Sequence, residues 1–327
     1  MLGAIIGDIV GSVYEWHNIK TKEFEFFSTR HRCSLTDDSI MTLAVARAIL
    51  NAKSGHKPLE EEAVIIMRSL GSKYPHAGYG GRFRHWLRAE NPEPYNSYGN
   101  GSAMRVSPCG FAADSLEEAI SMADDVTKVT HNHPEGMKGA EATAAAIYLA
   151  RTGKTIPEIR EYIEQNFYKI DFTLDEIRPS YTFDVSCQGS VPQALEAFFE
   201  STGFEDAIRN AISIGGDSDT IAAITGGIAQ AYYGIPADIR KKALTYLDDL
   251  QLSILRAFET KFGISDEAET VDADLSIDAE TAELFKKVCT ENGYNPQTVL
   301  NCFMKDFIVS SGHPEHVTGG MPWNKKD

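Results

Sequence analysis

The sequence predicts an all-α, multi-helix domain over residues 1–262, followed by a small extension. Almost every periodic segment has the 3.6-residue spacing of a helix. The repeated Val- and Ile-rich strands that a doubly wound sheet requires are missing. The chain has 327 residues, of which 43% are hydrophobic and 24% charged, a composition typical of a globular protein with a full core.

Charge and cysteine content exclude several classes of protein. The chain has 31 Lys and Arg against 47 Asp and Glu, and the net charge of −16 disfavours nucleic-acid and anionic-membrane partners. Five cysteines without a CxxC pair are expected to be reduced thiols. The N-terminal segment has no basic leader, and no apolar stretch reaches transmembrane length, so we expect a cytoplasmic protein without a membrane partner.

The first predicted helix starts near residue 3 and ends at Glu15. Glycines at every fourth position, Gly3, Gly7 and Gly11, give it a smooth face for close packing. Asp8 suits either a metal ligand or a buried hydrogen-bonding role, and we favour the second. Glu15 opens the polar loop 16–35, where a carboxylate can act as a general base or simply lie on the surface.

Two further helices are expected in the interior of the bundle. Residues 39–52 are apolar on almost all faces, and residues 219–233 are rich in Ala and Gly, which allow close backbone contact. Connections rich in Gly, Pro, Asn and Ser are expected at 71–81, 91–110 and 131–136. The remaining predicted helices are 58–70, 115–126, 136–152, 157–168, 192–201, 204–214 and 236–259.

Each interior helix is preceded by an acidic cluster. The clusters are Thr36-Asp37-Asp38-Ser39 and Gly215-Gly216-Asp217-Ser218-Asp219-Thr220. Helix capping would explain a single aspartate in such a position. Four carboxylates that converge at two helix ends would repel one another and require a cation. Their hard oxygen atoms favour Mg²⁺, Mn²⁺ or Ca²⁺ over zinc.

Taken together, these segments resemble the ADP-ribosylglycohydrolase family, which includes the enzyme that reactivates dinitrogenase reductase. The resemblance covers about residues 1–262 and rests on GAIIGDIVGSVYE at 3–15, LTDDS at 35–39 and GGDSDTIAAITGGIAQAYYGIP at 215–236. Segments 98–105, 130–134 and 186–192 also resemble family landmarks and follow the order of the family.

The resemblance implies an orthogonal α-helical bundle that binds two divalent cations, with Mg²⁺ expected before Mn²⁺. The implied reaction is hydrolysis of the N- or O-glycosidic bond at the distal ribose of an ADP-ribosyl group, carried by a protein side chain or a small molecule. Asp219 is the expected bridge between the ions, and Glu15 is the expected base or substrate-positioning residue. The ligands that the resemblance implies are Thr36, Asp37, Asp38, Asp217, Asp219 and Thr220.

Further residues are assigned to the substrate by the same resemblance. The residues expected to contact the diphosphate are Gly99, Asn100, Gly101 and Ser102, and His131 is expected near the nucleotide. An ordinary turn and a helix-capping histidine are the respective alternatives. His133 is expected to be structural, and Arg105 to be an anion partner or part of an ion pair. Ser39 stands where family members often have Thr. A non-catalytic ADP-ribose or nucleotide-binding regulator is the alternative function.

Residues 263–327 are predicted to be an acidic linker and a small strand–helix–helix extension. The period-two pattern at 271–277 and the helical patterns at 279–291 and 296–310 are similar to ribbon-helix-helix modules. Asp272, Asp274 and Ser276 on the polar face of the strand argue against DNA binding. A homodimer formed through 271–310, or docking to a partner, is favoured over a merely packed extension.

Overall fold

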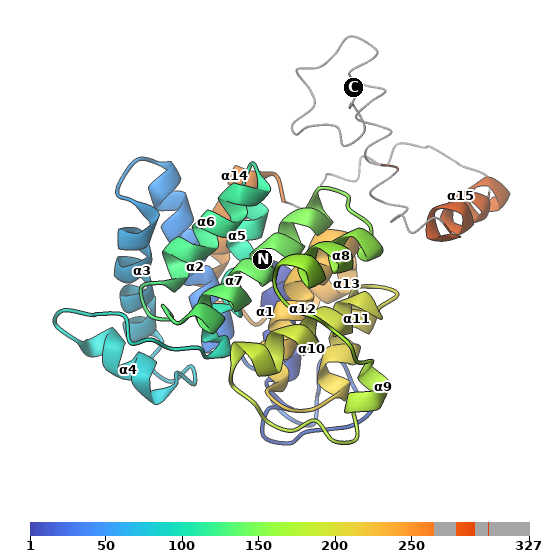
Figure 1. Cartoon of the computed structure of the whole chain (residues 1–327), viewed down its shortest axis with the longest axis horizontal. Helices are drawn as coiled ribbons and strands as arrows, with labels where there is room; N and C mark the ends of the chain where they lie inside the picture. The colour runs from blue at the N-terminus through green and yellow to red at the C-terminus, as the bar shows by residue number, and fades with distance from the viewer. Residues whose placement is uncertain (265–278, 292–299, 301–327) are drawn as a thin grey trace, which may run out of the picture.

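The computed structural model describes residues 1–264, 279–291 and 300. Two helices pack backbone to backbone inside its bundle. They are α1 (Leu2–Gly11) and α12 (Ser218–Tyr233), both almost entirely buried (Figure 1). A Cβ atom on Gly3 would lie 2.6 Å from the Gln230 Cβ, and one on Gly11 would lie 2.5 Å from the Asp219 Cα. The close packing expected from the glycine spacing is therefore confirmed, and α12 is the partner helix.

The other helices surround this pair in two groups. On one side, α2 (Asp37–Lys53) packs against α3 (Leu59–Lys73) and α14 (Asp249–Phe262), with α4 (Gly81–Arg88) beside α3. On the other side, α7 (Pro134–Arg151), α10 (Cys187–Phe199) and α11 (Phe204–Ser213) pack on α12. The remaining elements are α5 (Ser107–Ala112), α6 (Leu116–Thr127), α8 (Ile156–Asn166), α9 (Leu174–Ile177), α13 (Ala237–Leu244), α15 (Ala279–Glu291) and the short 3₁₀ helix η1 (Asn100–Ser102).

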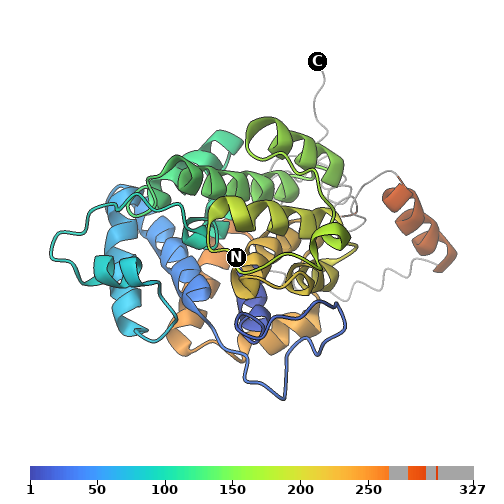
Figure 2. The same cartoon turned by 60° about the horizontal axis from the view of Figure 1, so that its bottom comes forward.

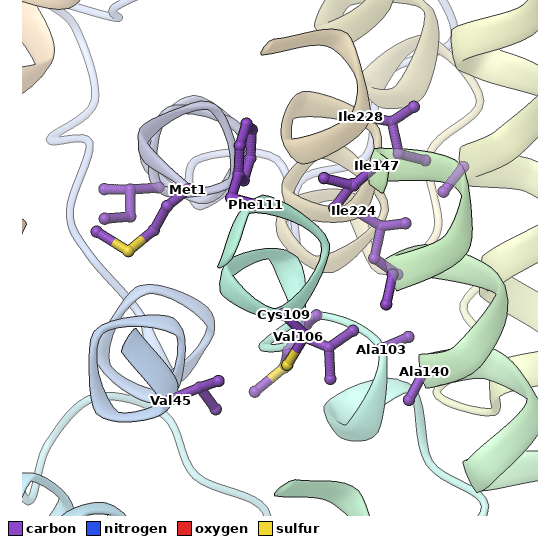
Figure 3. Packing of buried hydrophobic residues seen from close by; sticks show 14 of the residues in the cluster. Met1, Val45, Ala103, Val106, Cys109, Phe111, Ala140, Ile147, Ile224 and Ile228 are labelled. Carbon is purple, nitrogen blue, oxygen red and sulfur yellow. The ribbon is translucent and has the colours of Figure 1, made fainter. Parts of the chain in front are cut away.

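Helix α5 links the two groups through the hydrophobic core. Phe111 and Cys109 of α5 are buried, and Figure 3 shows Phe111 close to α1. On the opposite side of the core, Ile147 of α7 lies beside Ile224 and Ile228 of α12 (Figure 3). Burial of such side chains is the main contribution to the stability of the bundle.

The all-α prediction is confirmed, although several helix boundaries differ and helices α4, α5 and α9 were not predicted. Helix α1 ends at Gly11, so Glu15 lies on the following turn rather than at the helix end. Helix α10 begins five residues before Pro192, because the Ser186 hydroxyl caps it. The stretch predicted as one helix at 236–259 is two helices, because Asp248 and Gln251 form a capping box that starts α14. Helix α5 lies in a stretch expected to be a connection.

Within the ranges given above there is no β-sheet, only an isolated antiparallel bridge between Gly99 and Ser186. The predicted helix at 279–291 is confirmed as α15. The predicted strand at 271–277 lies outside the described residues, as does the helix predicted at 296–310 except for residue 300. Among the helices of the described part, none has both the length and the apolar content needed to cross a membrane. The cysteines that can be described, Cys33, Cys109, Cys187 and Cys289, are free thiols.

Candidate metal centre and substrate site

The acidic clusters predicted from the sequence lie at the N-termini of two neighbouring helices. Thr36 is the N-cap of α2, and its hydroxyl accepts a hydrogen bond from the Asp38 nitrogen at 3.3 Å. Asp217 is the N-cap of α12, with Asp219 in the first turn. The Thr220 hydroxyl of α12 donates to Asp38 Oδ2 at 3.2 Å, and this bond joins the two helix ends directly.

Five carboxylates meet at this point in two overlapping groups. Asp8, Asp38 and Asp219 each place an oxygen within 4.8 Å of the other two, and so do Glu15, Asp217 and Asp219. Asp219 belongs to both groups, which is the arrangement expected of a residue that bridges two ions. The clusters near residues 37 and 218 thus come together in space.

Asp37 is not a member of either group. Its side chain is half-buried, and its Oδ1 faces the loop at Gly78, where an added Cβ would lie 3.1 Å away. Burial, and then the charges of Asp8, Asp217 and Glu15, raise the pKa of Asp37 to about 7. Asp37 therefore lies at the edge of the same negative field.

Asp8 belongs to the cluster and is also strongly hydrogen-bonded. Its carboxylate accepts from the Thr36 nitrogen at 2.9 Å, the Thr36 hydroxyl at 2.7 Å and the Ser39 nitrogen at 3.1 Å, and also from the Ser39 hydroxyl. These contacts agree with the favoured structural role. The structure adds a second property, which is proximity to Asp38 and Asp219. Asp8 directly follows Gly7, one of the glycines that pack against α12, and this position beside the glycine stripe was the available signal.

Electrostatics at the cluster favours a cation. Burial raises the pKa of Asp8 to about 6, and burial followed by the charge of Asp217 raises that of Glu15 to about 7. The pKa values of Asp38 and Asp219 lie well above the ordinary range because both are buried beside other carboxylates. Asp38 Oδ1 is buried without a hydrogen-bond partner.

The described part of the chain offers no basic side chain to neutralise this charge. None of its Lys and Arg residues forms an ion pair with a carboxylate of the cluster. Carboxylates of this kind are stable together only when they are protonated or paired with a cation. The residues present therefore fit divalent cations held by oxygen ligands.

The segment 99–102 consists of Gly99 and the helix η1, and it lies next to the carboxylate cluster. The backbone nitrogens of Gly99, Asn100 and Ser102 donate to Ser97 Oγ, the Val185 oxygen and the Gly99 oxygen, so three of the four N–H groups are already used. Asn100 has a different role that the sequence did not indicate. Its amide donates to Asp217 Oδ2 at 2.7 Å and to Ser190 Oγ at 3.0 Å, and it thereby orients a carboxylate of the cluster.

His131 is buried beside η1, and a Cβ on Gly101 would lie 3.4 Å from its Nε2. Its Nδ1 lies 2.7 Å from the Thr130 hydroxyl. Burial, and then the charges of Arg105 and Arg82, hold the pKa of His131 well below its usual range, so the ring is neutral. His133, not His131, caps a helix: its Nδ1 accepts from the Glu135 nitrogen at the start of α7.

The hydrogen-bond partners of Arg105 among the described residues are a hydroxyl and a carbonyl group rather than a carboxylate. Arg105 is fully buried and donates to the Thr130 hydroxyl at 2.7 Å and to the Val126 oxygen at 2.9 Å. The hydrogen bonds of Arg105 thus hold the segment that carries His131.

Comparison with known proteins gives a consistent result. A model of the ADP-ribosylglycohydrolase family matches residues 1–264. Human ADP-ribosylhydrolase ARH3 is 28% identical over 344 residues, covering 79% of this chain and 92% of that protein. The ADP-ribosyl-[dinitrogen reductase] glycohydrolase of Rhodospirillum rubrum is 25% identical, covering 76% and 88%. The ADP-ribosylarginine hydrolase Tri1 of Pseudomonas putida is 32% identical over a shorter region, 46% of this chain and 43% of that protein.

A solved structure shares the fold. It is described as an ADP-ribosylglycohydrolase-related protein complex, and the match has a TM-score of 0.57 at 21% identity, covering 81% of this chain and 97% of that one. The orthogonal helical bundle expected from the sequence is thus confirmed.

Proposed function

The chain belongs to the ADP-ribosylglycohydrolase family, and on that basis we propose that it hydrolyses the glycosidic bond between the distal ribose of ADP-ribose and an acceptor, with two divalent cations bound. The observation that carries the proposal is the convergence of buried carboxylates from α1, α2 and α12 without a basic partner among the described residues. Family membership makes the chain a glycohydrolase. The cations, the site residues and the acceptor are what we propose.

The proposed cation ligands lie on the three elements that meet at the cluster. Asp219 belongs to both carboxylate groups and suits a bridging position. A bound divalent cation supplies positive charge that orients hydroxyl groups and stabilises developing negative charge. Oxygen ligands favour Mg²⁺, with Mn²⁺ as the alternative. The proposed ligands are Thr36, Asp37, Asp38, Asp217, Asp219 and Thr220, to which the geometry adds Asp8.

Glu15 is the proposed general base. It is half-buried at the cluster, and burial together with the charge of Asp217 raises its pKa to about 7. A carboxylate with a pKa near neutrality can accept a proton from water during the reaction. The water oxygen bonds to the anomeric carbon of the distal ribose as one water proton passes to Glu15. The bond from that carbon to the acceptor breaks, and the proton then passes from Glu15, directly or through solvent, to the departing acceptor.

The proposed substrate is an ADP-ribosylated protein side chain. The names of the relatives support this class, because they refer to ADP-ribosylarginine and to ADP-ribosyl-dinitrogen reductase. The ADP-ribose would occupy the region bounded by the cluster, η1 and the neutral ring of His131. A neutral histidine suits a nucleotide contact that requires a hydrogen bond rather than a charge.

The test is release of free ADP-ribose from peptides ADP-ribosylated on arginine or on serine. The full chain is incubated with Mg²⁺, with Mn²⁺ or with EDTA, and the products are separated by liquid chromatography. We expect release with a divalent cation and none with EDTA. Tight binding of ADP-ribose without turnover would instead identify a nucleotide-binding regulator. The absence of both release and binding would refute the proposal.

A further inference from the structure

We infer that Asn18 is a positioning residue that fixes Glu15 relative to Asp217 and Asp219. The inference rests on the proposed function, in which Glu15 is the general base. Glu15 lies four residues beyond the last residue of α1, so the helix does not hold it in place. It belongs to the loop between α1 and α2, which Figure 2 shows in dark blue at the edge of the bundle. Its distance to the carboxylates of α12 must be set by other contacts.

The side-chain amide of Asn18 supplies those contacts. Its Nδ2 donates to the Glu15 oxygen at 3.0 Å, the Tyr14 oxygen at 2.7 Å and the Gly216 oxygen at 2.9 Å. Its Oδ1 accepts from the Gly216 nitrogen at 2.8 Å. One side chain therefore joins the backbone of Glu15 to the residue that immediately precedes Asp217.

The turn before α12 is shaped to receive this amide. Gly215 and Gly216 have φ values of +71° and +77°, which residues other than glycine rarely adopt. A Cβ on Gly216 would also overlap the Tyr181 ring, at 3.2 Å from Cδ1 and closer to Cε1. The two glycines thus allow Gly216 to present both its N–H and its carbonyl group to Asn18.

A second contact brings the same loop to the same turn. Lys20 Nζ donates to the Ile214 oxygen at 2.5 Å and to the Tyr181 oxygen at 2.6 Å. Lys20 holds the loop, whereas Asn18 alone of the two contacts the peptide of Glu15. The amide is also specific, because an aspartate at this position would place a negative oxygen against three carbonyl oxygens.

The test is a double-mutant cycle between positions 18 and 15. Asn18→Ala and Asn18→Asp are made in the wild-type chain and in the Glu15→Gln chain. Hydrolysis is followed at saturating Mn²⁺, and the Mn²⁺ Kd is measured separately by calorimetry. Asn166→Ala is the matched control, because the Asn166 amide is also exposed and donates to the carbonyl four residues earlier, that of Tyr162, at 2.8 Å.

We expect Asn18→Ala to lower kcat by about ten- to hundredfold in the wild-type chain, because small displacements of a reacting group are costly. In the Asn18→Ala chain, KM and the Mn²⁺ Kd should change by less than about threefold, because substrate and cation binding stay intact. In the Asn166→Ala control, kcat should also change by less than about threefold. In the Glu15→Gln chain, Asn18→Ala should cause no further loss.

Two results would overturn the inference while leaving the proposed function intact. One is an equal loss of kcat in both backgrounds, which indicates that Asn18 acts independently of Glu15. The other is a loss confined to the Mn²⁺ Kd, which indicates an effect on the carboxylates of α12 alone. A wild-type chain that releases no ADP-ribose refutes the proposed function, and the inference about Asn18 is then refuted with it.

Discussion

Substitution of Gly7 by alanine tests the contact between α1 and α12. The added Cβ would lie 2.7 Å from the Ala223 nitrogen and closer still to the carbonyl group of Ala222. Both neighbours are backbone atoms, and the closer carbonyl contact requires the helices to separate by about 1 Å or more to restore ordinary contact, an overpacking distortion. We expect the free energy of unfolding to fall by about 3 kcal/mol, at the upper end of overpacking costs. For a domain of this size that corresponds to a Tm lower by about 6–12 °C.

The assay is thermal unfolding followed by circular dichroism in EDTA, so that cation binding does not contribute. Gly81→Ala is the matched control, because Gly81 starts α4 and a Cβ there meets nothing within 4 Å. The control should be neutral or more stable by about 0.4–1 kcal/mol, since alanine restricts the unfolded chain. A Gly7→Ala chain that unfolds within about 2 °C of wild type would refute the packing argument, since it would place the cost below 1 kcal/mol.

Three further predictions concern charge. Asp219→Asn should raise the Tm in EDTA, because it removes repulsion between Asp219 and the neighbouring carboxylates. The same variant should no longer be stabilised by Mn²⁺, and normal turnover would contradict the bridging role. Glu15→Gln should lower kcat by about a hundredfold or more, within the range for a general base, with the Mn²⁺ Kd unchanged by calorimetry. Away from the site, burial and the hydrogen bond that protonated Glu141 donates to Asp124 raise the pKa of Glu141 to about 7. Between pH 4.5 and 7 the folded chain thus binds the extra proton, and the free energy of unfolding falls as the pH rises. Urea unfolding at pH 5 and 8 should show that Glu141→Gln removes about 1 kcal/mol of this fall, a value reduced for solvent screening of the half-buried pair, whereas an unchanged slope would exclude the pair as its source.

Much of the fold could be predicted because local signals agree with the packing. The glycine spacing in α1 has a single structural use, which is close contact with another backbone. The errors occur where a local signal had two interpretations. Proline is common at the start of a helix, yet Pro192 lies inside α10 because the Ser186 cap starts the helix five residues before the proline. The capping box at Asp248 lies within a continuous apolar period, and the period alone predicts one long helix.

The candidate site was predictable in outline, but its contacts were not. The clusters at α2 and α12 have a sequence signal, which is an aspartate pair at the start of a buried helix. The bond from Asn100 to Asp217 joins residues that are 117 positions apart, and no local pattern reports it. The same is true of Asn18 and Gly216, which are 198 positions apart. Tertiary contacts of polar side chains therefore require the structure.

The glycine contact between α1 and α12 makes one part of the proposed site stiff. Asp8 and Asp219 are carried by main chains in direct contact, and rotation about side-chain bonds cannot widen the space between those helices. An arriving ion would meet ligands that lose little conformational freedom, so most of the favourable interaction is retained as affinity. Glu15 sits on a turn outside that contact, where the Asn18 amide rather than helix packing holds its main chain.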